Sequence, residues 1–253
     1  MLAQTRKEKI LDMLKEDGSV KVSELSKIFK VSDVTIRQDL EKLEQDRLVT
    51  REHGGAFLNT IGKQVQNFAL ANLINMDKKE LIGKKAAEFI DSGDTIILDS
   101  GTTTTEIAKA IIDKRNITII TNAINIVMLL GSNPAINVIL TGGEFKPPTL
   151  SLTGQKAADF FNGLHVDKLF LATAGISLKS GLTYPSLSDI AVKKAMIEAA
   201  DKVYLVADSS KVGKSSLASL GALSLIHFLI TDSDITEKDK EVFREHEIDF
   251  IIA

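Results

Sequence analysis

The sequence predicts a mixed α/β protein of two domains: a small N-terminal module of helices ending in a β-hairpin, and a larger domain built on a parallel sheet. Two patterns predict this division. Apolar residues recur at helical spacing through the first 45 residues, whereas short apolar strands alternate with amphipathic helices from Lys78 onward. The length of 253 residues, with 44% hydrophobic residues, suits one small module and one full-sized domain.

Three helices are expected in the N-terminal module. The first covers residues 5–17 and is followed by Gly18, a residue that suits a helix C-terminus. After a short extended segment, Ser23 is expected to cap a second helix that runs to residue 29. A tight turn leads to Ser32, which is expected to cap a third helix over 33–45.

A β-hairpin is expected to follow the third helix. The segment LVTREHGGAF at 48–57 has two extended arms around Gly54 and Gly55, as a hairpin turn with positive φ angles requires. Three helices and a hairpin make a winged helix-turn-helix domain, predicted over 1–57. A polar linker is predicted over 58–76, with a helix in its later part, and the second domain over 77–253.

The second domain is predicted to be doubly wound and Rossmann-like, because its strands are almost uninterruptedly apolar and would be covered by helices on both faces. Strands are expected over 95–99, 117–121, 137–141, 168–172, 202–207 and 227–231. Helices are expected over 79–92, 102–113, 123–130, 154–161 and 189–199.

Composition argues against several classes of protein. The chain has no cysteine, which rules out disulfides, thiolate nucleophiles and cysteine-ligated zinc. Its histidines, at 53, 165, 227 and 246, are scattered without the paired spacing of a metal site, so neither a metal nor a cofactor is expected. The N-terminus does not resemble a signal peptide, and the longest apolar stretch is too short to span a bilayer. We therefore expect a cytoplasmic protein.

Charge gives no support for DNA binding. The net charge is −3, and residues 1–56 carry seven Lys and four Arg against six Glu and five Asp. The basic footprint usual for DNA-binding proteins is missing. A prediction of DNA binding therefore depends on the pattern of helices alone.

The third helix carries the residue types that contact DNA bases. In a helix-turn-helix the second helix of the motif enters the major groove, and its N-terminal residues reach base edges. Arg37 suits guanine and Gln38 suits adenine. Ser32 is expected mainly to cap the helix, with a phosphate contact second. For Thr35 and Gln38, a solvated surface position is an equally good interpretation.

A phosphate-binding crevice is expected where the predicted strands end. Asp99 closes the first strand, and the following turn leads into a helix at Thr102, so that backbone N–H groups and the positive helix end face the crevice. Thr121 and Gly142 end the next two strands, so several strand ends converge on one ligand. The segment GTTTT lacks the lysine of a Walker loop, which argues against a nucleoside triphosphate. In the alternative interpretation, Asp99 orders the turn and Thr102 caps the helix.

Five motifs follow one another along nearly the whole chain: VSELSKIFKVSDVTIRQDLEKLEQDRLVTREHGGAF, ILDSGTTTTEIA, TNAINIV, LTGGEF and ADSSKVGKSS. In this order they resemble the DeoR family of bacterial sugar-metabolism repressors. The resemblance implies a winged-helix DNA-binding domain joined to a sensor domain similar in fold to ribose-5-phosphate isomerase. It also implies a homo-oligomer that a phosphorylated sugar releases from operator DNA.

The resemblance adds candidate contacts on the predicted wing and at the ligand. The predicted hairpin at 48–57 is the wing of this domain, and for it the resemblance favours contact with DNA over a plain exposed hairpin. At the ligand, Asp208 is expected to accept hydroxyl hydrogen bonds and Lys211 to neutralise phosphate, although a helix-dipole or surface ion-pair role fits each as well. Lys193 is expected to be solvated and is the weakest candidate. The predicted DNA contacts are Ser32, Asp33, Thr35, Arg37, Gln38, Arg51, His53 and Gly54. The predicted effector contacts are Asp99, Ser100, Gly101, Thr102, Thr103, Thr104, Thr121, Asn122, Gly142, Gly143, Gly175, Lys193, Asp208 and Lys211.

The chain departs from the family pattern at two places. Gln38 follows Arg37 where the family commonly has two adjacent arginines, so one phosphate contact is exchanged for a base or water contact. The acidic residue that the family often shows after the GLT turn corresponds here to Asp189, preceded by Ser188.

Two other functions fit parts of the sequence. A sugar-phosphate isomerase would use Asp99, Glu144, Asp208 and Lys211 as acid, base and cation. The glycine-rich, lysine-containing loop of ribose-5-phosphate isomerases is missing, however, so no enzyme is predicted. A ligand-independent DNA-binding factor would not need this concentration of Gly, Thr and Asp at one sheet edge. The sequence thus predicts a repressor of a carbohydrate-utilisation operon and leaves the sugar, the operon and the direction of control open.

Overall fold

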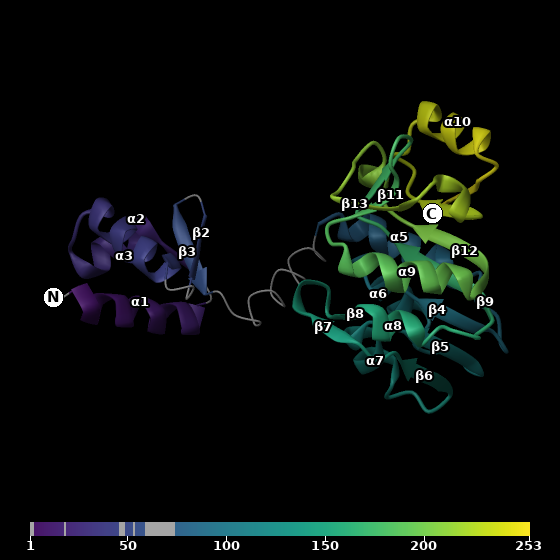
Figure 1. Cartoon of the computed structure of the whole chain (residues 1–253), viewed down its shortest axis with the longest axis horizontal. Helices are drawn as coiled ribbons and strands as arrows, with labels where there is room; N and C mark the ends of the chain where they lie inside the picture. The colour runs from purple at the N-terminus through teal and green to yellow at the C-terminus, as the bar shows by residue number, and fades with distance from the viewer. Residues whose placement is uncertain (1–2, 18, 46–48, 53, 59–73) are drawn as a thin grey trace. The chain divides into compact units, whose positions relative to one another are not determined.

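The computed structural model describes residues 3–17, 19–45, 49–52, 54–58 and 74–253. The chain forms two compact units, Met1–Asn67 and Phe68–Ala253, referred to below as the N-terminal and C-terminal units (Figure 1). Most of the predicted linker, including most of its expected helix, lies outside the described residues. No helix in the described part of the chain is long and apolar enough to cross a membrane.

The N-terminal unit has the predicted three helices and hairpin. Its helices are α1 (Ala3–Asp17), α2 (Val22–Phe29) and α3 (Asp33–Gln45). Its strands β1 (Ser19–Lys21), β2 (Val49–Glu52) and β3 (Gly55–Leu58) form an antiparallel sheet in the order β1-β3-β2. The core is formed by apolar residues at helical spacing that face inward, among them Ile10, Leu14, Leu25, Ile36 and Leu40.

The two predicted serine caps have different outcomes. The cap at Ser32 is confirmed, since the N–H of Thr35 donates to Ser32 Oγ at 3.2 Å. The cap at Ser23 is wrong, because α2 begins one residue earlier, at Val22, and has no side-chain cap. There the N–H of Val22 donates to the carbonyl of Gly54 at 2.8 Å. The hairpin backbone thus binds an N–H group at the start of α2 that a cap would otherwise satisfy.

The C-terminal unit is built on a parallel sheet, as predicted, but the sheet has seven strands, one more than the six expected. The sheet has the order β15-β14-β12-β9-β4-β5-β6, and its neighbouring strands run parallel. The strands are β4 (Thr95–Leu98), β5 (Ile117–Thr121), β6 (Ile136–Leu140), β9 (Val166–Ala172), β12 (Ala200–Val206), β14 (Phe228–Thr231) and β15 (Asp249–Ile252). The chain runs outward from β4 to β6 and returns to β9 on the other side of β4. The strand order therefore reverses between β4 and β9, where open α/β folds bind their ligands.

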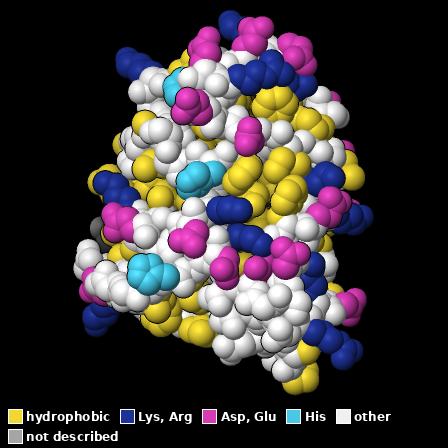
Figure 2. All heavy atoms as spheres, turned by 90° about the vertical axis from the view of Figure 1, so that its right-hand side faces the viewer, with side chains coloured by type: hydrophobic (Ala, Val, Ile, Leu, Met, Phe, Trp, Pro, Cys, Tyr) yellow, Lys and Arg dark blue, Asp and Glu magenta, His cyan; other side chains and the backbone are white. Residues whose placement is uncertain are grey.

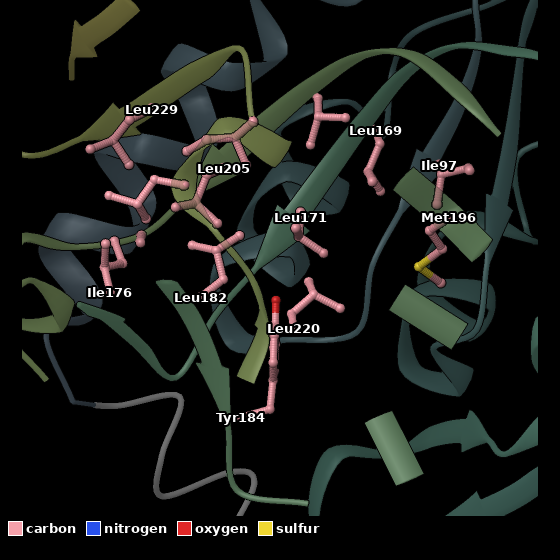
Figure 3. Close-up of a cluster of buried hydrophobic side chains, with 14 of the residues drawn as sticks. Ile97, Leu169, Leu171, Ile176, Leu182, Tyr184, Met196, Leu205, Leu220 and Leu229 are labelled. Carbon is pink, nitrogen blue, oxygen red and sulfur yellow. The ribbon is translucent and has the colours of Figure 1, made fainter. Parts of the chain in front are cut away.

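Helices cover both faces of this sheet. Alternate residues of a strand face opposite sides, and Ile96 and Ile97 of β4 accordingly belong to two different apolar clusters. The cluster with Ile96 includes side chains of α5 (Met76–Ala87), α6 (Thr102–Ala110) and α7 (Ile124–Leu130). The cluster with Ile97 includes Met196 and other side chains of α8 (Gln155–Asp159) and α9 (Ser188–Glu198) (Figure 3).

Several short elements were not predicted. They are the β7 (Glu144–Lys146) and β8 (Ser151–Thr153) hairpin with η1 (Pro147–Thr149), the antiparallel sheet of β10 (Gly175–Ser177), β11 (Gly181–Tyr184) and β13 (Ala218–Gly221), the turns η2 (Ser209–Lys211) and η3 (Leu223–Leu225), and α10 (Glu237–Glu245) with β15 at the C-terminus. Strands of three or four residues carry too little periodicity to be recognised in a sequence.

Candidate functional site

The exposed face of α3 carries the predicted base contacts. Arg37 and Gln38 are exposed, whereas Ile36 and Leu40 are buried in the core of the N-terminal unit. Asp33, the first residue of α3, is also exposed, at a helix end where a negative charge is favourable. The helix therefore presents an arginine and a glutamine to solvent within its first turn and a half.

Ser32 and Thr35 are bonded to each other. Besides the cap, their hydroxyl oxygens lie 2.9 Å apart. Both side chains therefore fix the start of α3, which favours the capping interpretation of Ser32. Arg37 and Gln38 are then held at a defined position on a stable first turn.

Ser32→Ala is expected to lower the free energy of unfolding of the N-terminal unit by about 1 kcal/mol, the usual cost of losing a helix cap. Ser23→Ala is the matched control, because Ser23 is exposed and caps no helix; its effect should stay within about 0.5 kcal/mol. Urea unfolding followed by circular dichroism measures both. Equal losses would contradict the assignment of the cap.

The wing, formed by β2 and β3, is hydrogen-bonded to α3. The Nε of Arg51 lies 2.7 Å from Glu44 Oε2, and the N–H of Arg51 donates to Glu44 Oε1 at 2.9 Å. These bonds, first that from the backbone N–H, lower the pKa of Glu44. Gly54 is exposed and has a φ of +84°, as the predicted turn requires. His53 lies outside the described residues.

A buried ion pair orients α3 against α1. Arg6 Nε lies 2.5 Å from Asp39 Oδ2, and Nη2 donates to Oδ1 at 3.2 Å, with the two side chains only 7% and 8% exposed. The hydrogen bond to Asp39 raises the pKa of Arg6. The two-point contact fixes both the position and the rotation of α3 at the residue next to Gln38. This pair was not predicted from the sequence, because its partners lie on different helices.

In the C-terminal unit, the first predicted effector residue lies at the switch point of the sheet. Asp99 follows β4 and is fully buried, and its Oδ2 accepts a hydrogen bond from the N–H of Ala172 at the end of β9, at 3.1 Å. Gly101 comes close to the same residue, since a Cβ there would lie 2.7 Å from Ala172 Cβ. The turn from β4 into α6 is thus packed directly against the end of β9.

Lys193 is buried rather than solvated, which corrects the prediction. Its side chain is 4% exposed, and its ammonium forms an ion pair with Asp99 and lies 4.7 Å from the ring centre of Tyr184. The Tyr184 hydroxyl in turn donates to the Ala172 carbonyl at 2.7 Å. Burial raises the pKa of Asp99, and the positive charge of Lys193 opposes this. Lys193 is buried because α9 packs against this face of the sheet.

Asp189 lies one turn before Lys193 on α9. It is 5% exposed, and Lys146 Nζ of β7 lies 2.6 Å from its Oδ2. Asp189, carried over from the family pattern, thus joins the β7–β8 hairpin to α9. Lys146 and Tyr184 were not predicted, since they belong to short strands that the sequence did not reveal.

A second group of polar residues surrounds Asp208, which follows β12 and is 1% exposed. Its Oδ1 accepts hydrogen bonds from Asn75 Nδ2 at 3.0 Å and from the N–H of Ser210 at 3.1 Å. Asn75 immediately precedes α5. Lys78 of α5 pairs with Asp234 at 2.7 Å and with Asp232, beyond β14, at 3.0 Å, and these two carboxylates, first Asp234, raise its pKa. The beginning of α5 is therefore attached to the carboxyl ends of β12 and β14.

Lys79 joins the same region. It is 3% exposed, and its pKa is lowered by burial, with Asp208 and Lys211 among the charges that act on it. From the sequence, Lys79 was expected only to begin a helix. A lysine this deeply buried cannot be recognised from helical spacing, because lysine usually lies on the exposed face.

Buried oxygen atoms without a hydrogen-bond partner follow several neighbouring strands. Five such atoms lie at the carboxyl ends of β14, β12, β4, β5 and β6: Thr231 Oγ1, Asp208 Oδ2, Asp99 Oδ1, Asn122 Oδ1 and Thr141 Oγ1. A sixth, Asn125 Oδ1, lies in the first turn of α7. A buried acceptor without a donor is unfavourable, and a ligand with hydroxyl groups provides such donors.

The turn after β4 has the predicted form. Ser100 and Gly101 connect β4 to α6, and residues 102–104 form the first turn of that helix. The alternative role of Thr102 as a cap is wrong, because Gly101 precedes the helix without a side-chain cap. Thr104 instead donates its hydroxyl to the Gly101 carbonyl at 3.1 Å.

The remaining candidates have structural contacts. The Thr121 hydroxyl donates to the Leu98 carbonyl at 2.6 Å, and Asn122 Nδ2 donates to the Leu152 carbonyl at 3.0 Å. Gly142 and Gly143 connect β6 to β7. Gly175 lies in β10 of the smaller sheet, where a Cβ would come within 2.6 Å of the Lys214 carbonyl. Close packing therefore explains the glycine at position 175 without a ligand.

Together, a helix-turn-helix with an exposed second helix and an α/β domain with polar strand ends define a transcriptional regulator with a sensor domain. Comparison with known proteins supports this class. The family described as DeoR-like helix-turn-helix domain matches residues 6–61, and that described as DeoR C terminal sensor domain matches residues 74–233. The chain belongs to the DeoR family.

Relatives that are named as regulators match the chain over nearly their full length. The chain is 37% identical to the uncharacterized HTH-type transcriptional regulator YulB of Bacillus subtilis, over 93% of this chain and 91% of that protein. It is 31% identical to the glycerol-3-phosphate regulon repressor of Escherichia coli, over 94% of each. It is 32% identical to the putative aga operon transcriptional repressor of Escherichia coli O157:H7, over 98% and 93%. These names agree with the prediction of a regulator rather than an enzyme.

Among solved structures, ribose 5 phosphate isomerase A from Neisseria gonorrhoeae matches with a TM-score of 0.40 and 16% identity, over 55% of this chain and 54% of that one.

Proposed function

We propose that this regulator is a repressor of a carbohydrate-utilisation operon and that a phosphorylated sugar, bound at the carboxyl edge of the C-terminal sheet, controls its DNA binding. The observation that carries the proposal is the row of buried, unpartnered oxygens at five strand ends around the switch point. Hydroxyl donors of a sugar suit such a row. Two relatives are named as repressors of the aga operon and the glycerol-3-phosphate regulon, which supports a ligand of this class.

Different residues bind the phosphate and the hydroxyl groups of the ligand. The N-terminus of α6 at residues 102–104 offers backbone N–H groups and the positive helix end to the phosphate. Asp99 Oδ1 and Asp208 Oδ2 accept hydroxyl hydrogen bonds from the two sides of the switch point. Lys211, which is half-buried in the turn after β12, neutralises phosphate charge.

The Asn75–Asp208 hydrogen bond gives a route from the ligand to the DNA-binding unit. Asp208 accepts a hydrogen bond from Asn75 at 3.0 Å, and Asn75 immediately precedes α5, near the end of the proposed linker at 58–76. A ligand that binds Asp208 changes the hydrogen bonding of Asn75 and, through the covalent chain, the position at which the linker ends. Such a ligand acts only if it binds the two states with different free energies.

The working form is a homo-oligomer in the cytoplasm, where the operator lies. Two winged helices of one oligomer contact half-sites about 34 Å apart, or a multiple of this distance, which is one turn of duplex. Arg37, Gln38 and the wing provide these contacts. Ligand binding changes the spacing or tilt of the two winged helices and thereby the affinity for the operator.

A thermal-shift measurement with a panel of sugar phosphates tests the ligand, with the free sugars and inorganic phosphate as controls. A ligand at 100 times its Kd stabilises the C-terminal unit by about 2.7 kcal/mol, so one phosphorylated sugar should raise the melting temperature clearly. Lys211→Ala should remove most of this shift, and Lys214→Ala, an exposed lysine of the same segment, should keep it.

The opposite outcome favours the second candidate function. If no sugar phosphate raises the melting temperature while DNA still stabilises the protein, the chain is a ligand-independent DNA-binding factor, and the proposed effector is wrong.

A further inference from the structure

Val34 is an exposed apolar side chain at the N-terminal end of α3, the end proposed to contact DNA. It is 64% exposed, and Ile28 of α2, at 56%, is the other exposed large apolar residue among those N-terminal residues whose side chains the structure describes. The remaining apolar residues of α3 are buried in the core. Packing within this unit therefore does not explain a valine at position 34.

The position of Val34 is well defined. Residues three and four apart share a face of a helix, so Val34 lies on the same stripe as Arg37 and Gln38. The bonded pair of Ser32 and Thr35 flanks it and fixes the first turn. A β-branched side chain in a helix has one strongly preferred χ1 rotamer, so its methyl groups are held at one place.

The surroundings of Val34 do not suit a protein interface. Asp33, Arg37, Gln38 and Glu41 are all exposed around it, so no continuous apolar patch is formed on this face of α3. An interface for a second protein needs a larger apolar core than a single valine. A DNA groove needs no such patch, because its apolar features are single methyl groups.

Thymine supplies such a feature. In the major groove, thymine carries a C5-methyl group, and apolar side chains contact it. We infer that Val34 is a specificity-determining residue that packs against the C5-methyl group of a thymine, next to the bases contacted by Arg37 and Gln38. Val34 thus gives the helix an apolar contact in addition to its two hydrogen-bonding side chains.

Replacement of thymine by deoxyuridine tests this contact, because it removes the methyl group and leaves the hydrogen bonds of the base unchanged. A duplex is first selected with the full chain from a randomised DNA pool. Each thymine of a half-site is then replaced in turn, and affinity is measured by fluorescence anisotropy. At one position the replacement should weaken binding of the unaltered protein about fourfold, the loss expected for one buried methyl group.

Val34→Ala should bind the thymine and deoxyuridine duplexes equally well at that position. Alanine favours the helix, so this variant keeps the fold. Ile28→Ala, the matched exposed apolar residue on α2, should retain the fourfold difference, and Val34→Thr, which keeps one methyl group, should show a smaller difference.

Three outcomes would overturn the inference. In the first, Val34→Ala still distinguishes thymine from deoxyuridine as well as the unaltered protein does. In the second, no thymine of the selected duplex responds to the replacement. In the third, the selection returns no common sequence, which would also remove the role of α3 in sequence recognition.

Discussion

Lys193→Met is expected to lower the free energy of unfolding of the C-terminal unit by about 3–5 kcal/mol, because it leaves the Asp99 carboxylate buried without its partner. Asp99 is fully buried and Lys193 is 4% exposed, so water does not replace the lost ion pair. Methionine keeps most of the side-chain volume, which limits the cavity that remains. Urea unfolding of the full chain, followed with a signal from the C-terminal unit, measures the loss.

Two variants separate the ion pair from other effects. Lys194→Met changes the next residue of α9, which is exposed, and should alter stability by no more than about 0.5 kcal/mol. Adding Asp99→Asn to Lys193→Met removes the unpaired charge and should recover part of the loss. A loss of less than about 1 kcal/mol for Lys193→Met alone would contradict the buried pair. Because Asp99 supports the fold, Lys211 is the better residue for testing ligand contact.

Arg6→Met is expected to have the second largest effect. It leaves Asp39 unpaired between α1 and α3 and should cost about 2–3 kcal/mol, less than a pair deep in a larger core. A domain of this size has only about 3–5 kcal/mol of stability. The variant should therefore lose DNA binding through partial unfolding of the N-terminal unit, although Arg6 lies in α1 and is not one of the proposed DNA contacts.

The thermal transitions of the two units distinguish partial unfolding of the N-terminal unit from the loss of a direct DNA contact. In Arg6→Met, the thermal transition of the C-terminal unit should be unchanged, while that of the N-terminal unit shifts to lower temperature. Glu41→Gln removes an exposed acidic group of α3 and should leave both transitions in place. Loss of DNA binding in Arg6→Met with both transitions unchanged would contradict a structural role.

The sequence predicted those parts of the fold that have long, regular patterns. The bounds of α3 agree with the structure, and the six predicted strands of the parallel sheet are present with ends that differ by at most two residues, whereas β15 was not predicted. The start of α2 was predicted wrongly, because the N–H of Val22 donates to the carbonyl of Gly54. This is a tertiary contact that Ser23 does not reveal. The short antiparallel strands were missed for lack of periodicity, and Tyr184 with them.

The candidate sites were also predicted only in part. Asp99 and Asp208 were found because they follow apolar strands, and parallel strands end at one edge. Their partners were not found, since Lys193 lies 94 residues after Asp99, and Asn75 lies 133 residues before Asp208. Only the packing of α9 and α5 against the sheet brings these side chains together.

The central claim is that one chain couples a sugar-phosphate site to DNA binding. The most direct test measures the affinity of the full chain for its selected duplex with and without the sugar phosphate that raises its melting temperature. Coupling of about 1–3 kcal/mol is typical of such regulators, so the affinity should change between about 5-fold and 150-fold, and the duplex should change the affinity for the sugar phosphate by the same factor. An affinity for the duplex that is the same at zero and saturating sugar phosphate would contradict the claim.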